Sequence, residues 1–455
     1  MTRGREEKRK RIKEARLCAR AACSLALVLA NCLLFFLFLP SPLPRFPQIT
    51  AAAASPPSSL TATRAGRLAV FDDVWATVRA RYYDPALGGV DWQAWGASLR
   101  QQAAEAQTQS ELYAILRRLV APLQDAHTRV YAPGEYADWQ RPRYLTTGVA
   151  LSELAGALVV ARVEPDSAAA RGGVRAGDEL LSVDGEVAAT LFARRSAEFT
   201  GSSTARAARR EALARLFDGP ADTSIAAVFK DERGHTKMVQ LKRTWAVRAP
   251  AFSFTREGAY AIVHFNTFTP EIALALTRAL RTDLRRTRGL VLDLRANGGG
   301  DAEAMTDIAS AFLPASTSLG RFTDRAGQTD SAPQTRTTLL LAADEVVSFR
   351  GPLVVLVSAR TASAAEIFAA ALHERGRARL VGEATCGCVL GVRRRHTLPD
   401  GGALDLSELD YRTAAGTRLE RAGLTPDETV APTRDDLRTG RDPAVARAIK
   451  ILEAR

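Results

Sequence analysis

The chain has 455 residues and a net charge of +12, and 46% of its residues are hydrophobic while 25% are charged. Its length predicts several domains, and its composition excludes a largely disordered chain. Residues 1–20 hold nine basic and three acidic side chains, which is half of the net charge, so the rest of the chain lacks the excess typical of nucleic-acid binding and none is expected.

An uncharged apolar run over residues 21–39 follows this basic tail and ends at Pro40. It is long enough to cross a bilayer, and the basic flank predicts a cytoplasmic N-terminus with the remaining chain on the periplasmic or extracellular side. We expect a transmembrane anchor; the alternative is a signal segment cleaved near Ala51–Ala54, which leaves a secreted protein. Residues 40–64, rich in Pro, Ser and Ala, predict a flexible linker.

Of the five cysteines, only Cys386 and Cys388 lie outside the N-terminal region. One pair cannot form the disulfide framework of a small secreted domain, so a hydrophobic core is expected to hold the exported part together. The two side chains either pack as small residues or form a redox-sensitive disulfide. Two ligands do not make a metal site, and no metal is expected.

The folded part is predicted to begin with helices and to continue with strands. Apolar residues recur at helical spacing between Leu68 and Leu123, which predicts an N-terminal helical domain over residues 65–145. Over residues 146–245 short apolar runs predict strands, and the sequence SAAARGGVRAGDELLSVDG at residues 167–185 resembles a PDZ domain.

A PDZ domain adds the C-terminal strand of a peptide to an open sheet edge and holds its carboxylate on backbone N–H groups. The resemblance implies that Gly148, Val149, Ala150 and Leu151 form the peptide-binding loop and strand. The alternative is a PDZ-shaped spacer that binds no ligand.

Residues 246–455 alternate buried apolar strands with helices, one of them over residues 271–286, and predict an α/β core. In one loop of this core, Gly298 and Gly299 stand between a strand and a helix, where backbone N–H groups suit an oxyanion hole or a phosphate nest. The lysine followed by serine or threonine that a phosphate loop requires is absent. In a second loop, Ser363 is either a nucleophile or a helix N-cap.

The two loops carry a family likeness. GLVLDLRANGGGD at residues 289–301 and VLVSARTASAAEIFAAALHERGRARLVGEATCG at residues 355–387 resemble the catalytic core of the carboxyl-terminal processing (tail-specific) serine peptidases. With the PDZ-like segment, the likeness covers about residues 65–455. It implies a ClpP/crotonase-like α/β catalytic core with an inserted PDZ-like β-domain and an N-terminal helical domain. It also implies Ser363 as nucleophile, an oxyanion held by the N–H groups of Ala364 and of Gly298 or Gly299, and no cofactor.

The better-known branch of this family pairs its serine with a lysine 25 residues downstream, where this chain has Cys388. No lysine lies between Lys242 and Lys450, so a Ser–Lys dyad would require Lys450 to fold back. The segment LQDAHT resembles the one that supplies the catalytic histidine in the tricorn-like branch, which implies His127 as general base.

The tricorn-like branch also has a downstream glutamate, which Glu420 matches. In that branch a hydroxyl residue just before the histidine links to the glutamate, but this chain has Ala126 there. The group that orients His127 is therefore Glu420, Asp125 or Thr128. Without the family likeness, His127 would be interpreted as a structural histidine and Glu420 as a solvated charge.

These features predict a membrane-anchored or exported serine endopeptidase that recognises the free C-terminal tails of protein or peptide substrates. Two other functions remain open: a non-catalytic protein of the cell envelope that binds peptide tails, and a protein that binds small hydrophobic molecules on the same fold. A serine-reactive phosphonate separates the peptidase from both binders, because only an activated serine reacts.

Overall fold

The computed structural model describes residues 59–135, 143–199, 201–339 and 345–454. The predicted basic tail, the apolar run over residues 21–39 and nearly all of the predicted linker lie outside these ranges. Within the described ranges, no helix combines the length and apolarity that a membrane crossing requires.

Helices form the N-terminal part of the described chain: α2 (Arg64–Arg81), α3 (Trp92–Glu105) and α4 (Gln109–Val120). Each begins after a short polar side chain that accepts a hydrogen bond from the first turn: Thr63, Asp91 and Thr108. Their core, around Leu112 and Leu116, also contains Leu404 and Leu406 of β18 (Ala403–Arg412). The helices are therefore packed on a strand from the C-terminal part of the chain.

Antiparallel strands dominate residues 143–247. The main sheet has the order β3-β4-β5-β7-β8, with β6 paired to β5, and β2 pairs with β9 separately. The strands are β2 (Arg143–Thr146), β3 (Val149–Leu154), β4 (Ala157–Val163), β5 (Glu179–Val183), β6 (Glu186–Val187), β7 (Ser224–Lys230), β8 (Thr236–Lys242) and β9 (Thr244–Val247). The helices are α5 (Ala168–Arg171), α6 (Ala188–Glu198) and α7 (Ala205–Ala214). Since β3 is an edge strand, one of its sides can accept a further strand.

A six-stranded sheet in the order β10-β11-β12-β15-β16-β19 is the frame of the C-terminal part. β10 runs antiparallel to β11, and the other neighbours are parallel. The strands are β10 (Phe252–Glu257), β11 (Tyr260–Phe265), β12 (Gly289–Asp293), β15 (Leu353–Val357), β16 (Arg379–Gly382) and β19 (Glu428–Thr429).

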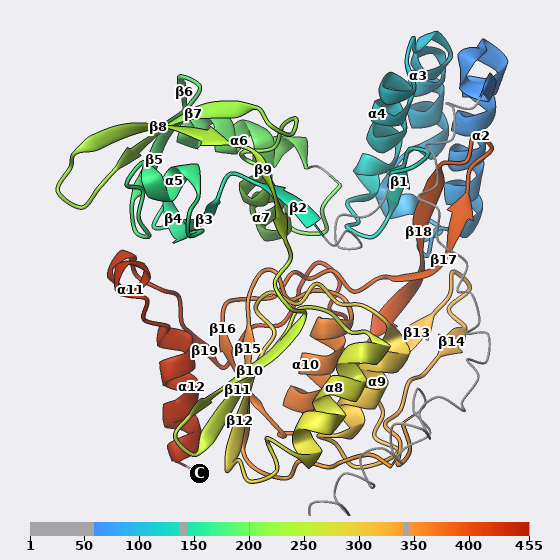
Figure 1. Cartoon of the computed structure of the whole chain (residues 1–455). Coiled ribbons are helices and arrows are strands. Elements are labelled where there is room, and N and C mark those ends of the chain that lie inside the picture. The colour runs from blue at the N-terminus through green and yellow to red at the C-terminus, as the bar shows by residue number, and fades with distance from the viewer. Residues whose placement is uncertain (1–58, 136–142, 200, 340–344, 455) are drawn as a thin grey trace, which may run out of the picture. The chain divides into compact units, whose positions relative to one another are not determined.

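Helices cover both faces of this sheet (Figure 1). On one face lie α8 (Pro270–Arg281), α9 (Ala302–Ser310) and α10 (Ala364–Glu374), and on the other α12 (Pro443–Glu453), which follows α11 (Arg434–Thr439). Side chains alternate along β15: Val355 and Val357 pack with α8, α9 and α10, whereas Val354 and Leu356 pack with α12. The carboxyl ends of these strands lead into the two glycine- and serine-bearing loops.

A second sheet has the order β1-β18-β13-β14, with β17 also paired to β18. Its further strands are β1 (Arg129–Tyr131), β13 (Arg321–Thr323), β14 (Thr329–Ser331) and β17 (Gly391–Thr397). Val130 of β1 lies opposite Leu404 of β18. Since His127 is two residues before β1, this pairing ties the histidine to the C-terminal part of the chain.

The helix predicted over residues 271–286 is shorter in the structure, where α8 ends at Arg281. Thr282 leaves the helical region with φ −115° and ψ −88°, and its hydroxyl donates to the carbonyl of Arg278. Helical spacing of apolar residues continues past this point because Leu284 still packs in the core, so periodicity alone did not reveal the end of the helix.

Candidate active site

Ser363 stands at the turn between β15 and α10 with φ 57° and ψ −128°. A positive φ is costly for a residue other than glycine, by about 1–3 kcal/mol, and persists only where the surrounding structure fixes it. Ser363 occupies the N-cap position of α10, but its side chain makes no capping hydrogen bond to that helix. The hydroxyl is thus presented at a helix N-terminus and not used by the helix.

Hydrogen bonds and close packing hold the glycine loop, residues 297–300, against the turn at Ser363. The N–H of Ala362 donates to the carbonyl of Asn297 over 3.1 Å, and the fully buried Asn297 amide donates to the carbonyl of Phe265 over 3.1 Å. Gly299 approaches so closely that a Cβ atom there would lie 2.6 Å from the Cβ of Ser363. The structure therefore brings the two predicted loops into direct contact.

Three backbone N–H groups were predicted as oxyanion donors, and they differ in their partners. No hydrogen bond among the described residues engages the N–H of Ala364, the first residue of α10. The N–H of Gly299 donates to the side chain of Asn297 over 2.9 Å. The N–H of Gly298 makes only a long bond of 3.4 Å to the carbonyl of Asn266. Ala364 and Gly298 are consequently more available to a ligand than Gly299.

We expect Gly299→Ala to lower kcat/KM by about 100-fold, because the new methyl group would displace the turn that carries Ser363. Overpacking of this kind also lowers the free energy of unfolding by about 1–3 kcal/mol. The control is Gly376→Ala, at a residue with φ 62° and no atom within 4 Å of the added Cβ. This variant incurs only the backbone strain, and peptide hydrolysis by both variants, with their thermal midpoints, tests the expectation. Equal activity of the two variants would contradict it.

A buried carboxylate binds the chain segment that contacts the backbone of Ser363. Glu366, in α10, accepts hydrogen bonds from the N–H groups of Gly387 (2.8 Å) and Cys388 (2.9 Å) and from the hydroxyl of Thr385. Burial raises the pKa of the Glu366 carboxyl, and these hydrogen bonds oppose that rise. Sequence reasoning missed Glu366, although a single acidic residue within an apolar helical run was a usable signal.

Cys386 and Cys388 form a disulfide in the structure. The carbonyl of Cys388 accepts the N–H of Ser363 over 2.8 Å, and the N–H of Cys386 donates to the carbonyl of Thr361 over 2.9 Å. Of the two sequence-based alternatives, the disulfide is the one observed. At the position where the family likeness would place a lysine, Cys388 contacts the serine through its backbone.

His127 is held mainly through its backbone. Its N–H donates to the carboxylate of Asp125 over 2.8 Å, and the same carboxylate accepts the hydroxyl of Thr128. The ring Nδ1 lies 4.0 Å from Asp125, is buried, and has no hydrogen-bond partner among the described residues. Burial lowers the pKa of His127, Arg129 lowers it further, and Asp125 opposes the shift.

Residues adjoining the predicted base and nucleophile share one small apolar cluster. Ala126 and Ala362 both pack against Ala207 and the Cys386–Cys388 disulfide. The structure therefore brings the segments of His127 and Ser363 together. Among the described residues no hydrogen bond joins the histidine ring to the serine hydroxyl, a contact that commonly tightens only when substrate is bound.

Glu420 is buried, with 4% of its surface exposed. One carboxylate oxygen accepts the N–H of Val389 over 2.8 Å, whereas the other has no partner within hydrogen-bond distance among the described residues. Burial raises the pKa of Glu420 to about 7, while hydrogen bonding from Ser203 and Val389 opposes the rise and the charge of Asp125 adds to it. A carboxyl with this pKa changes charge near neutral pH.

Ser203 lies between Glu420 and the histidine segment. Its side chain is buried, and its hydroxyl oxygen accepts the N–H of Ala126 over 3.1 Å. Hydrogen bonding from the same hydroxyl lowers the pKa of the Glu420 carboxyl, against the rise that burial causes. Sequence reasoning missed Ser203 because it belongs to a loop of the β-rich segment far from His127 in the chain. Ser203 thus places a hydroxyl beside Ala126, where the sequence itself has none.

The other candidate bases lie elsewhere. Lys450 is an exposed residue of α12, on the sheet face opposite α10. His373 is 3.0 Å from Asp427, and His235 is 3.3 Å from Asp231 in the turn between β7 and β8. His264 lies 3.9 Å from Asp293, and His396 lies 3.4 Å from Glu408. His127 is the histidine whose neighbour, Ala126, packs in one cluster with Ala362 of the serine loop.

In the predicted peptide-binding segment, Val149, Ala150 and Leu151 belong to the edge strand β3. Gly148 precedes them with φ 79°, and its N–H donates to the hydroxyl of Thr146 over 2.9 Å. A side chain at Gly148 would collide with Ser167, 2.3 Å away. Because β3 is an edge strand of its sheet, it has the open edge that peptide addition requires.

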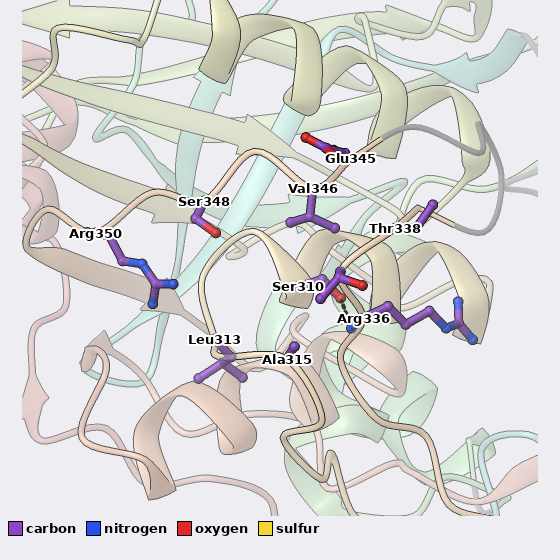
Figure 2. Close-up of a pocket in the computed structure, with 10 residues that line it drawn as sticks. Ser310, Leu313, Ala315, Arg336, Thr338, Glu345, Val346, Ser348 and Arg350 are labelled. Atoms are coloured by element: carbon purple, nitrogen blue, oxygen red, sulfur yellow. Dashed lines mark hydrogen bonds between the residues drawn. The ribbon is translucent and has the colours of Figure 1, made fainter.

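Two cavities in the described part of the chain lie apart from these residues. Figure 2 shows one of about 350 Å³, lined by Ser310 at the end of α9 and by residues within 336–338 and 345–350; the N–H of Arg336 donates to the Ser310 hydroxyl there. The other, of about 160 Å³, lies beside Arg295 and Asp442. Neither is lined by Ser363, His127 or Glu420, so the contacts described above define the candidate site.

Comparison with known families places three matches along the chain. Residues 259–430 match peptidase family S41, residues 64–121 match the tricorn protease C1 domain, and residues 159–191 match a PDZ domain.

Whole proteins match over most of the chain. A carboxyl-terminal-processing protease of Synechocystis sp. is 28% identical over 392 residues, covering 82% of this chain and 83% of that protein. The chloroplastic carboxyl-terminal-processing peptidase 1 of Arabidopsis thaliana is 25% identical over 386 residues, covering 81% and 73%. Among solved structures, a photosystem II D1 C-terminal processing protease is 25% identical with a TM-score of 0.53, covering 80% of this chain and 93% of that one. The predicted α/β fold class is confirmed.

Proposed function

Since the chain is a serine-type peptidase of the carboxyl-terminal processing family, S41, and carries a PDZ domain, we propose that Ser363 is its nucleophile and His127 its general base. One observation carries this assignment: Ser363 is held in a strained, positive-φ turn against the glycine loop, and its hydroxyl is not used by the helix that follows. The lowered pKa of His127 leaves the ring neutral near pH 7, as a general base requires.

In the proposed reaction, the Ser363 hydroxyl attacks the scissile carbonyl carbon while His127 takes the hydroxyl proton. The N–H groups of Ala364 and Gly298 hold the oxyanion of the tetrahedral intermediate. His127 then gives the proton to the leaving amine, and water hydrolyses the acyl-enzyme by the same route. The non-catalytic alternatives draw no support from the family comparisons.

Glu420 acts in this proposal as a positioning residue. Its carboxylate orients the segment before His127 through the Ser203 hydroxyl, which accepts the N–H of Ala126. Asp125, the alternative predicted from the sequence, fixes the backbone of His127 but lies 4.0 Å from the ring Nδ1.

Glu420→Gln is expected to lower kcat about tenfold, because the amide retains the shape but not the charge of the carboxylate. In the wild-type chain, loss of the Glu420 charge below pH 7 lowers activity, since the carboxyl has a pKa of about 7. The acid limb of the pH–rate profile should therefore move to lower pH in the variant, where only His127 titrates. An unchanged acid limb would exclude this role, whatever the effect on stability.

The proposed substrates are proteins or peptides with free C-terminal tails, in keeping with relatives whose names describe them as carboxyl-terminal-processing peptidases. Support comes from the open edge of β3 and the N–H-bearing turn at Gly148. The catalytic part is proposed to act outside the cytoplasm, where the Cys386–Cys388 disulfide is stable. Membrane attachment through residues 21–39 and the predicted domain boundaries remain predictions.

The test compares hydrolysis of one fluorogenic peptide with a free or an amidated C-terminus. The full chain is expected to cleave the free form with about tenfold higher kcat/KM, because a charged carboxylate is held more strongly than an amide. Hydrolysis of neither peptide by a folded chain would contradict the peptidase assignment, and equal hydrolysis would contradict tail recognition.

A further inference from the structure

The Cys386–Cys388 disulfide closes a ring of three residues, with Gly387 between the two cysteines. Gly387 has φ 73°, a conformation that favours glycine. A Cβ atom at this position would lie 3.0 Å from the side chain of Thr204 and 3.1 Å from the backbone of Arg421. Neighbouring segments of the chain therefore pack directly on the ring.

Every backbone N–H and carbonyl group of this ring makes a hydrogen bond to another segment. The three N–H groups donate to the carbonyl of Thr361 and to the carboxylate of Glu366. The three carbonyls accept the hydroxyl of Thr204 and the N–H groups of Arg421 and Ser363, each over 2.8 Å. The ring is thus a junction between the nucleophile turn, α10, α7 and the segment that follows β18.

The two sulfur atoms belong to the apolar cluster between the segments of the proposed base and nucleophile. Cys386 and Cys388 are only 3% and 1% exposed. Their apolar neighbours are Ala126, Ala207 and Ala362. Reduction would replace the S–S bond by two thiols, which must move apart because non-bonded atoms cannot approach as closely as bonded ones. This separation would displace the backbone that holds the nucleophile turn.

Stabilisation of the fold does not account for a bond at this place. A disulfide stabilises a fold chiefly by closing a long loop of the unfolded chain, whereas this ring spans three residues. The bond acts instead on the native state, where the N–H of Cys386 donates to Thr361 and the carbonyl of Cys388 accepts the N–H of Ser363.

We propose that the Cys386–Cys388 disulfide is a positioning element of the active site, and that the chain becomes active only when these two thiols are oxidised. The inference rests on the proposed peptidase function and deepens it by naming the regulation of the same site. In a reducing compartment both cysteines remain thiols, so the newly made chain is inactive there. After export the bond forms, and the Ser363 turn takes its active geometry.

Oxidation proceeds by thiol–disulfide exchange with a disulfide such as oxidised glutathione. The thiolate of one cysteine attacks a sulfur of the oxidant and releases one thiol, which leaves a mixed disulfide. The thiolate of the other cysteine attacks the protein sulfur of that mixed disulfide, forms the Cys386–Cys388 bond and releases the second thiol. Two electrons pass from the cysteines to the oxidant, and the two cysteine protons end on the released thiols. Because both sulfur atoms are buried in the folded chain, exchange precedes the completion of folding.

The test compares two forms of the full chain, unfolded in denaturant and refolded with either oxidised glutathione or dithiothreitol. Alkylation followed by mass spectrometry establishes whether Cys386 and Cys388 are bonded or free. We expect the thiol form to fold and to have a kcat about 100-fold lower, because catalysis is that sensitive to a misplaced nucleophile. KM should be nearly unchanged, since the edge of β3 is not altered. Refolding the thiol form with oxidised glutathione should restore kcat.

Hydrogen exchange supplies a readout that does not depend on catalysis. The amide of Ser363 donates to the carbonyl of Cys388, so residues 361–366 should exchange faster in the thiol form. If neither form hydrolyses peptides, the peptidase assignment fails and this comparison alone decides the positioning role. Equal exchange in the two forms would overturn the proposal, as would an equal and measurable kcat. A thiol form that cannot fold would also overturn it, because the bond would then be required for folding.

Two variants assign the effect to this pair of cysteines. The chain with both Cys386→Ser and Cys388→Ser cannot form the bond, so it should match the thiol form and respond to neither reagent. The matched control replaces the other three cysteines with serine, and it should respond to both reagents as the wild-type chain does; these are Cys18, Cys23 and Cys32. A double variant with the kcat of the disulfide form would contradict the proposal.

Discussion

Replacing Ser363 with alanine is expected to lower kcat by a factor of about 10,000 or more, because the other hydroxyls of its loop, those of Ser358 and Thr361, are already engaged with the carbonyls of Arg295 and Leu294. The fold should persist, since the side chain makes no capping hydrogen bond in the structure. Peptide hydrolysis and a thermal unfolding curve measured on the same preparation test both statements. Substantial remaining activity in the folded variant would refute Ser363 as nucleophile.

Ser363→Gly provides a control that separates chemistry from backbone strain. Glycine adopts φ 57° readily, so this variant should be more stable than Ser363→Ala by about 1 kcal/mol while being equally inactive. If the alanine variant were as stable as the glycine variant, the turn would not be strained in the way described.

His127→Ala is expected to lower kcat by a factor of about 1,000–10,000, since it removes the proposed proton acceptor. The base must be neutral to accept the serine proton. Because the pKa of His127 is lowered from its ordinary value of 6.5, activity in the Glu420→Gln background should fall only at a pH below 6.5. When His127→Ala is added to the Glu420→Gln chain, this acid limb should be absent.

His235→Ala is the matched control for the histidine substitution. His235 is an exposed residue of the turn between β7 and β8, paired with Asp231, and its loss should leave kcat and the pH profile unchanged. If His127→Ala behaved like His235→Ala, another group would have to be the base. Lys450 would be a poor replacement, because it lies in α12 on the opposite face of the sheet.

The family, the α/β class and the contact between the two catalytic loops could be predicted from the sequence because their signals are local. The glycine run follows one buried strand and Ser363 another, and the carboxyl ends of parallel strands meet at one edge of a sheet. The comparisons confirm the predicted serine-type peptidase. The roles of individual residues remain predictions that the variants test.

The supporting contacts could not be predicted, because they join segments far apart in the chain. Ser203 contacts Ala126 only after the β-rich segment has packed on the catalytic part, and no periodicity encodes that packing. Glu366 and the Cys386–Cys388 disulfide were visible as residues, but their common function of fixing the Ser363 backbone emerges only from hydrogen bonds in three dimensions.

The pairing of β1 with β18 was likewise not foreseen. The sequence predicted an N-terminal helical domain over residues 65–145, and did not indicate that the residues just after His127 pair with a strand of the catalytic part. Three residues suffice for this pairing, and so short a segment gives no alternation pattern to read. The pairing is what holds His127 near the serine loop before substrate binds.

Labelling by a fluorophosphonate tests the central assignment most directly, since this probe reacts only with an activated serine. The purified chain is compared with its Ser363→Ala, His127→Ala and His235→Ala variants under identical conditions. The account predicts labelling of the wild-type and His235→Ala chains and its loss in the other two. Labelling that persists without Ser363 or without His127 would contradict the proposed Ser–His pair.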